Sequence, residues 1–192
     1  MNASAINPRL YPLLATIAIF VVGYAICYMQ FPAMLSTRVI GNLLTDNAYL
    51  GIVAVGMTIV ILSGGIDLSV GAVIAFAGVF IAVLLRDTGL HPLVVFALLL
   101  LVTSAFGAAM GWLIHALAMP AFIVTLAGMF LARGAAYMLT IDSIAISHPF
   151  ISYLQNAYWL LPGRGRLTLI GVLMLLAVLA GVLIAHRTRF GA

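Results

Sequence analysis

One polar stretch carries most of the residues whose types could do chemistry. Residues 63–71 read Ser-Gly-Gly-Ile-Asp-Leu-Ser-Val-Gly and interrupt a long, nearly unbroken apolar run. Gly64 and Gly65 permit backbone angles that other residues avoid, and Asp67 or Ser69 can accept hydrogen bonds from the free N–H groups that open the next helix. We therefore expect a broken or re-entrant helix near residues 63–71.

Two interpretations of this stretch stay open. The stretch is either a tight turn at the membrane surface, with Asp67 as a plain helix cap, or a discontinuous helix that lines a path through the membrane. Broken backbone at membrane depth is tolerated only where protein or a water-filled cavity covers it. A charge at the bilayer centre costs roughly 2.5–3.5 kcal/mol on insertion scales, so a deep Asp67 needs a partner.

Arg133 is the other charged residue that lies clearly inside an apolar segment. It follows Pro120 by about 13 residues, which places it roughly 20 Å along a helix that begins there, beyond the bilayer midplane. Its side chain is expected either to snorkel to the interface or to pair with an acid inside the bundle; a place on the path is the alternative.

The composition determines where the chain resides and excludes several chemistries. Of the 192 residues, 66% are hydrophobic and 6% are charged, whereas soluble domains carry about a quarter charged residues. The chain has no Lys, so it holds no phosphate-binding P-loop and is not itself an ATPase; it has no Glu, so it lacks the HExxH zinc motif. The scattered Arg residues do not form a nucleic-acid-binding face. Cys27 is alone, so no intrachain disulfide and no redox compartment follow from it.

Five or six apolar segments are long enough to cross a bilayer, because about 20 helical residues span its hydrocarbon core. The sequence therefore predicts an all-α, polytopic integral membrane protein with 5–6 spans. The predicted spans are Leu10–Met29, Ala48–Leu62, Val70–Leu85, Pro92–Leu117, Ala121–Thr140 and Leu167–Ala185.

Turn-forming residues separate these spans, among them Ser36-Thr37-Arg38 and a polar stretch, Ser143–Arg166, which we expect to be loops. Within the latter, aromatic-rich Ser147–Leu161 is predicted to lie at the headgroups or to be an ordinary loop packed on helix ends. The Arg distribution does not decide the orientation. His186-Arg187-Thr188-Arg189 after the last span favours a cytoplasmic N-terminus.

Two weaker patterns concern helix packing. Gly107/Gly111 and Ala177/Gly181 are small residues four apart, which lets helices approach closely. Ala77–Ala82 (AGVFIA) is echoed by Ala127–Ala132 (AGMFLA). Chance can produce such an echo in an apolar chain, and a true repeat would suit a transporter.

Two ordered blocks resemble a known family. The run Gly56–Gly71, GMTIVILSGGIDLSVG, is similar to the signature of ribose-type sugar permeases of bacterial ABC importers. The block Pro120–Met129, PAFIVTLAGM, followed by Arg133-Gly134 and Tyr137, supports the same resemblance. The resemblance covers essentially the whole chain, and permeases of galactofuranose importers are the nearest branch.

The resemblance implies a sugar permease subunit of the bacterial inner membrane, not an enzyme. Its implied partners are a cytoplasmic ATPase that carries ATP and Mg²⁺, a second identical or paralogous permease, a periplasmic sugar-binding protein and the lipid bilayer. No cofactor, metal or nucleic acid is expected on this chain. Because sugars are neutral, hydroxyl groups suffice to line a path. The predicted lining residues are Thr58, Ser63, Gly64, Gly65, Asp67, Ser69, Thr125, Arg133 and Tyr137.

Permeases of this family run well past 300 residues, so residues 1–192 are expected to be the N-terminal part of one permease domain. Thr188-Arg189-Phe190-Gly191 resembles the start of the stretch that precedes the ATPase-coupling segment. The alternatives are a small-solute channel or carrier not driven by ATP, and an intramembrane serine protease. The protease is disfavoured because Ser63 is preceded by Ile61-Leu62 and no His is suitably spaced.

Overall fold

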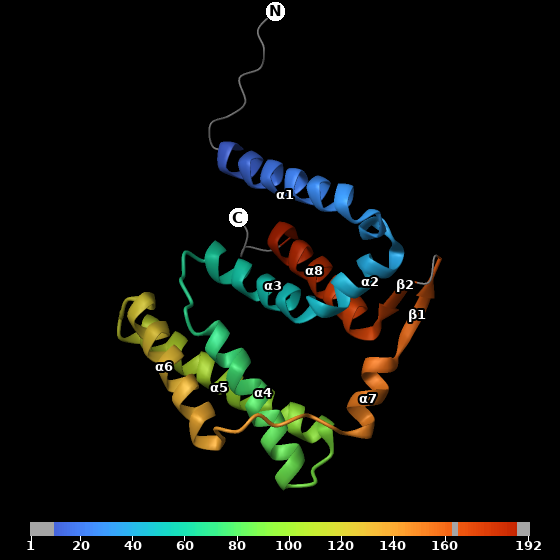
Figure 1. Ribbon diagram of the computed structural model, residues 1–192. Helices are drawn as coiled ribbons and strands as arrows, with labels where there is room; N and C mark the ends of the chain where they lie inside the picture. The colour runs from blue at the N-terminus through green and yellow to red at the C-terminus, as the bar shows by residue number, and fades with distance from the viewer. Residues whose placement is uncertain (1–9, 163–164, 188–192) are drawn as a thin grey trace, which may run out of the picture.

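The computed structural model describes residues 10–162 and 165–187, so the predicted Thr188–Gly191 stretch lies outside the described residues. The elements, in chain order, are α1 (Tyr11–Gln30), the 3-10 helix η2 (Pro32–Leu35), α2 (Thr37–Asp46), α3 (Ala48–Leu62), α4 (Val70–Asp87), α5 (Pro92–Ala116), α6 (Ala121–Leu139), α7 (Pro149–Asn156), β1 (Tyr158–Leu161), β2 (Gly165–Thr168) and α8 (Leu169–Arg187). The predicted helical membrane bundle is confirmed, and each predicted span matches a helix to within two residues at either end (Figure 1).

Five of the described helices, α1, α4, α5, α6 and α8, are long and apolar enough to cross a membrane. The pair α2 and α3 passes the same test together but is bent by 57° at its junction, which gives up to six spans. The predicted number of spans is therefore confirmed.

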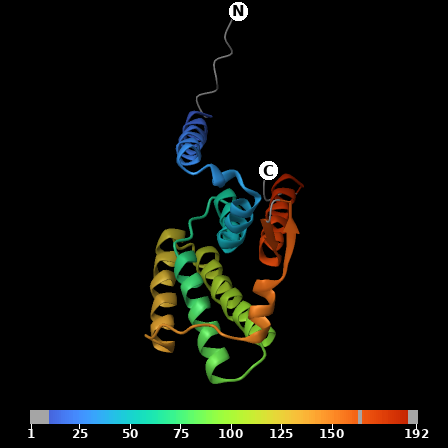
Figure 2. The same cartoon turned by 45° about the vertical axis from the view of Figure 1, so that its right-hand side comes forward.

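One group of elements is a three-helix bundle of α4, α5 and α6 (Figure 2). The strongest packing in it joins α4 to α6, which run in the same direction side by side. The echoed segments at 77–82 and 127–132 therefore lie on neighbouring helices. Their last residues, Ala82 and Ala132, are both buried. Small side chains at such positions let the two backbones approach closely.

The second group consists of α2, α3, α8 and the β1–β2 hairpin, with α3 packed along α8. Glycines make this seam close: a Cβ added at Gly181 would lie 2.5 Å from Cγ1 of Val55, and one added at Gly51 would lie 2.5 Å from Sδ of Met174. The hairpin packs on α2 in the same way, because a Cβ at Gly165 would lie 2.6 Å from the carbonyl oxygen of Thr37.

Two predicted loops are wrong in part: residues 143–148 are irregular as predicted, but other residues of both stretches lie in helices or strands. At Ser36-Thr37-Arg38 the chain enters α2, because the Ser36 hydroxyl accepts from the N–H of Val39 at 3.4 Å and caps the helix. The Ser143–Arg166 stretch forms α7, which begins at Pro149, and an antiparallel hairpin in which Tyr158 pairs with Thr168. Proline is favoured in the first turn of a helix, where its missing N–H costs nothing.

The hairpin is held by a contact with α2, far away in the sequence, and by a contact between its own strands. The hydroxyls of Thr45 and Thr168 lie 2.9 Å apart, and the Arg166 guanidinium sits 4.6 Å from the centre of the Tyr158 ring. On the outside, Tyr153 and Trp159 are 72% and 56% exposed. Ser147–Leu161 is therefore a helix and a strand with outward aromatics rather than a loop.

Candidate functional site

The break after α3 is a glycine-based helix end. Gly64 has a positive φ of 77°, its N–H donates to the carbonyl of Ile61 at 3.0 Å, and the N–H of Gly65 donates to the carbonyl of Val60 at 2.9 Å. This pair of bonds is the Schellman arrangement, which satisfies the last carbonyls of a helix and turns the chain away. The predicted helix break is confirmed, and Gly64 is the residue whose backbone angle requires glycine.

Asp67 organises the approach to α4. Its Oδ1 accepts from the backbone N–H of Ser69 at 2.8 Å and from the Ser69 hydroxyl at 2.7 Å. Of the two predicted caps, Asp67 acts as an acceptor at the start of α4, whereas the Ser69 side chain makes no cap bond to the helix. Ser69 is 1% exposed and donates its hydroxyl to Asp67. Two donors on one oxygen hold that carboxylate in a fixed direction.

Thr125 connects α6 to the break. Its Oγ1 lies 2.8 Å from the carbonyl oxygen of Ala121 and 3.3 Å from that of Ile66, and the residue is 4% exposed. The contact with Ile66 bridges 59 residues of sequence. Residues 65–69 belong to neither helix nor strand. The Gly65 N–H and the Ser69 carbonyl still bond to the flanking helices, so the backbone polar groups of residues 66–68 are the ones that lie outside the helix ladders.

These residues surround a groove of about 460 Å³, which we call the break groove. That volume lies within the range of small-molecule sites, about 300–1,000 Å³. Its lining residues are Val60, Ser63, Gly64, Gly65, Ile66, Asp67, Gly107, Met110, Gly111, Ile114, Ala121 and Thr125.

Gly107 and Gly111 keep the α5 wall of the break groove open. A Cβ added at either position would meet no atom within 4 Å. The prediction that this pair lets helices approach closely is therefore wrong for Gly107 and Gly111, whereas Gly181 of the other predicted pair does lie in a tight seam. The sequence did not reveal that α5 lines the groove, because Gly107/Gly111 and Ala177/Gly181 follow the same pattern of small residues four apart.

The remaining predicted lining residues lie elsewhere. Thr58 donates to the carbonyl of Ala54 at 2.8 Å and lines a hollow of about 350 Å³ between α3 and α8. Arg133 and Tyr137 line a third hollow, near the C-terminal end of α6. The structure thus brings together Ser63, Gly64, Gly65, Asp67 and Thr125, with Ser69 behind Asp67, and separates the other three.

Arg133 is exposed and makes no ion pair within residues 10–162 and 165–187, where the structure records one salt bridge, Arg86 to Asp87 at 2.6 Å. The predicted alternative of an acid partner inside the bundle is therefore not found in the described part of the chain. The same part of the chain contains no cluster of His, Cys or Asp that could hold a metal ion.

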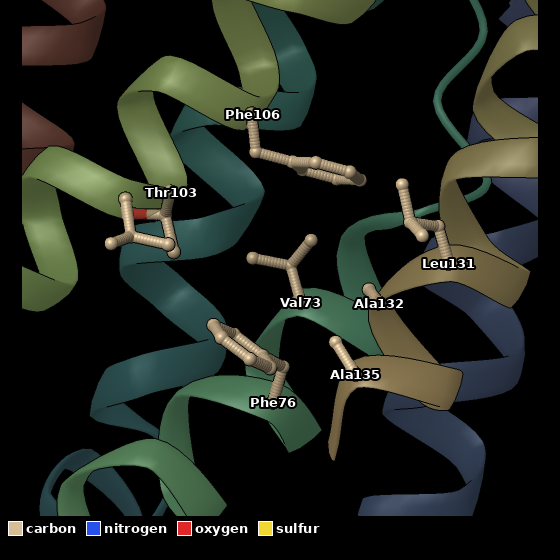
Figure 3. A pocket seen from close by; sticks show the side chains of 8 residues that line it. Val73, Phe76, Thr103, Phe106, Leu131, Ala132 and Ala135 are labelled. Atoms are coloured by element: carbon tan, nitrogen blue, oxygen red, sulfur yellow. The ribbon is translucent and has the colours of Figure 1, made fainter. Parts of the chain in front are cut away.

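The middle of the three-helix bundle is apolar. Figure 3 shows side chains from α4, α5 and α6 around a small cavity of about 130 Å³, among them Phe76, Phe106 and Leu131. Thr103 also lines it, but its hydroxyl donates to the carbonyl of Leu99 at 2.8 Å and is satisfied within its own helix. This cavity offers no polar group to a ligand.

Comparison with known proteins assigns the family. Residues 39–192 match the family model described as "Branched-chain amino acid transport system / permease component". The chain is 59% identical over 183 residues to the inner membrane ABC transporter permease protein YjfF of Escherichia coli, covering 95% of this chain and 55% of that protein. The chain belongs to this permease family. No solved structure matches it.

Further relatives include the fructose import permease protein FruG of Bifidobacterium longum, 34% identical over 97% of this chain and 56% of that protein. The ribose import permease protein RbsC of Bacillus subtilis is 36% identical over 83% of this chain and 49% of that protein. The chain thus spans about half the length of these curated relatives. Family and apolar helices together place it in the bacterial inner membrane as a multi-pass protein.

Proposed function

We propose that this chain forms part of the permease of a binding-protein-dependent ABC importer that carries a sugar across the inner membrane. Support comes from the names of its relatives, which include import permeases for fructose and ribose and a transport permease for xylose. Within this class, galactofuranose or a related monosaccharide is the substrate we propose.

The break groove is the observation that carries the proposal. It combines the backbone of residues 66–68, the buried Thr125 and a single carboxylate whose Oδ1 is fixed by Ser69. The Ser63 hydroxyl donates to the carbonyl of Val60 at 2.7 Å, so it can offer a ligand only its acceptor lone pairs. Unwound backbone and helix ends inside a membrane bundle are how transporters contact their substrates. A sugar is neutral and rich in hydroxyls, so it needs alternating donors and acceptors rather than a charged clamp.

The energy for transport comes, in this proposal, from a cytoplasmic ATPase that holds ATP and Mg²⁺. A second permease subunit completes the path, and a periplasmic sugar-binding protein delivers the substrate. ATP hydrolysis rocks the two permease subunits so that the path opens to one side at a time. The glycines of the break allow α3 and α4 to change their relative angle.

Uptake of labelled sugars into vesicles containing the full-length permease and its ATPase tests the proposal. We expect Asp67→Ala to lower uptake at least about tenfold, because Ser69 loses the acceptor that fixes the start of α4. Asp67→Asn should have a smaller effect, because the amide oxygen still accepts. The matched control is Asp46→Asn, an exposed residue at the end of α2 that lines none of the three hollows.

Wild-type uptake should depend on ATP and should be inhibited by competing unlabelled galactose, ribose, xylose or fructose. Uptake that continues without any ATPase partner would instead indicate a channel or carrier and would overturn the proposal. Normal transport and expression of Asp67→Ala would show that the break groove is not part of the sugar path.

A further inference from the structure

A second polar hollow lies at the other end of α6 from the break groove. Ala75 and Val79 of α4 form one wall, and Arg133, Tyr137 and Asp142 are among the residues that form the other. We call it the Arg133 hollow; its volume is about 330 Å³. It lies where the chain leaves α6 and crosses α4 toward α7 (Figure 1).

The two hollows are separate. Thr125 lines the break groove, and Tyr137, which lines the Arg133 hollow, follows it by about 12 residues, or about 18 Å along the helix. The two hollows therefore lie near opposite ends of α6. The residues around the cavity in Figure 3 lie between these ends and are almost all apolar. A polar ligand would therefore be held at one end or the other, and not in the middle.

The lining of the Arg133 hollow has the groups that bind a polyol. The Arg133 side chain lines the hollow and makes no hydrogen bond or ion pair with the described residues, so none of these residues uses its donors. Asp142 lines the hollow and is exposed, and its backbone N–H donates to the Thr140 hydroxyl at 3.0 Å, which fixes the backbone at this position. Tyr137 is 70% exposed and presents an aromatic ring.

The charges of the hollow select among ligands. Arg133 and Asp142 carry opposite charges, and Arg86, which interacts electrostatically with Asp142, is itself paired with Asp87. An anionic ligand therefore gains from Arg133 and loses to Asp142. A neutral polyhydroxyl molecule instead uses both groups, donating to the carboxylate and accepting from the guanidinium. Its apolar C–H face can pack on the Tyr137 ring.

We propose that the Arg133 hollow is a binding site for a neutral polyhydroxyl molecule, separate from the break groove. The identification of that molecule as the transported sugar rests on the proposed function. The permease then has two polar binding sites, the break groove and the Arg133 hollow, one near each end of α6. Binding at the hollow requires neither ATP nor a partner protein.

Protection of a cysteine from a thiol reagent tests the site in the full-length permease. Ile141 lines the hollow and is 85% exposed. The reporter is therefore Ile141→Cys in a full-length background from which Cys27 and every other cysteine have been removed. Met138→Cys, at a residue that is 90% exposed and outside the hollow, is the control. Galactose is added up to about 100 mM, which covers millimolar dissociation constants, and galacturonate is its anionic counterpart.

We expect galactose to slow labelling at the reporter at least about threefold and to leave the control unchanged, with galacturonate weaker than galactose. Adding Arg133→Gln or Tyr137→Ala to the reporter should abolish protection, whereas Tyr153→Phe on α7 should not.

Three results would overturn the site: no protection by galactose, equal protection at the control, or protection that survives Arg133→Gln in a well-folded protein. Stronger protection by galacturonate would overturn the preference for a neutral ligand. If transport proves independent of ATP but protection remains, the proposed function fails and the site stands.

Discussion

The α3–α8 seam and the α5 wall of the break groove both contain glycines, and the glycines do opposite things. At the seam, Gly51 packs against Met174 and Gly181 packs against Val55, so neither position has room for a side chain. On α5, Gly107 and Gly111 face empty space. One pair brings two helices together, and the other keeps a hollow open. A glycine in a helix therefore does not by itself show whether its face packs on another helix or lines a hollow.

The largest effect should follow from a substitution at the seam. Gly181→Val places a branched side chain where Cγ1 of Val55 already lies 2.5 Å from the added Cβ. Overpacking of this kind costs about 1–3 kcal/mol, so α8 must shift and the Tm of the purified full-length permease should fall by several degrees. Gly78→Val, at an α4 position with no atom within 4 Å, is the control. An unchanged Tm for Gly181→Val would show that the seam is not tight.

A substitution on the α5 wall should affect transport and leave stability intact. Gly111→Leu fills part of the break groove without meeting another atom at Cβ. We expect sugar uptake to fall at least about tenfold while Tm changes by less than about 2 °C, because no native contact is displaced. Gly78→Leu, outside the described hollows, should leave uptake unchanged. Equal losses of uptake in the two variants would contradict a role for the groove.

The helices were predictable from sequence because long apolar runs fix where spans begin and end. The break was predictable for a local reason: Gly64, Gly65 and Asp67 act within a few residues of one another. The packing of the hairpin on α2 was not predictable, because it includes the Thr45–Thr168 contact across 123 residues.

The site shows the same division between local and distant contacts. Residues 63–69 were found together because they are neighbours in sequence, whereas the proximity of Thr125 to Ile66 arises from the packing of α6. Thr58, Arg133 and Tyr137 were chosen for their polar side chains, but polarity does not reveal which hollow a residue lines. The α5 glycines escaped notice because a missing side chain carries no chemical signal.

Blocking the break groove itself tests the central claim most directly. Ser63 is exposed and lines the groove, so Ser63→Cys, in a background from which Cys27 and every other cysteine of the full-length permease have been removed, accepts a bulky maleimide there. We expect sugar uptake by the full-length permease with its ATPase to fall in proportion to the labelled fraction, and added sugar to slow the labelling. Undiminished uptake after complete labelling would contradict the assignment of the groove to the sugar path.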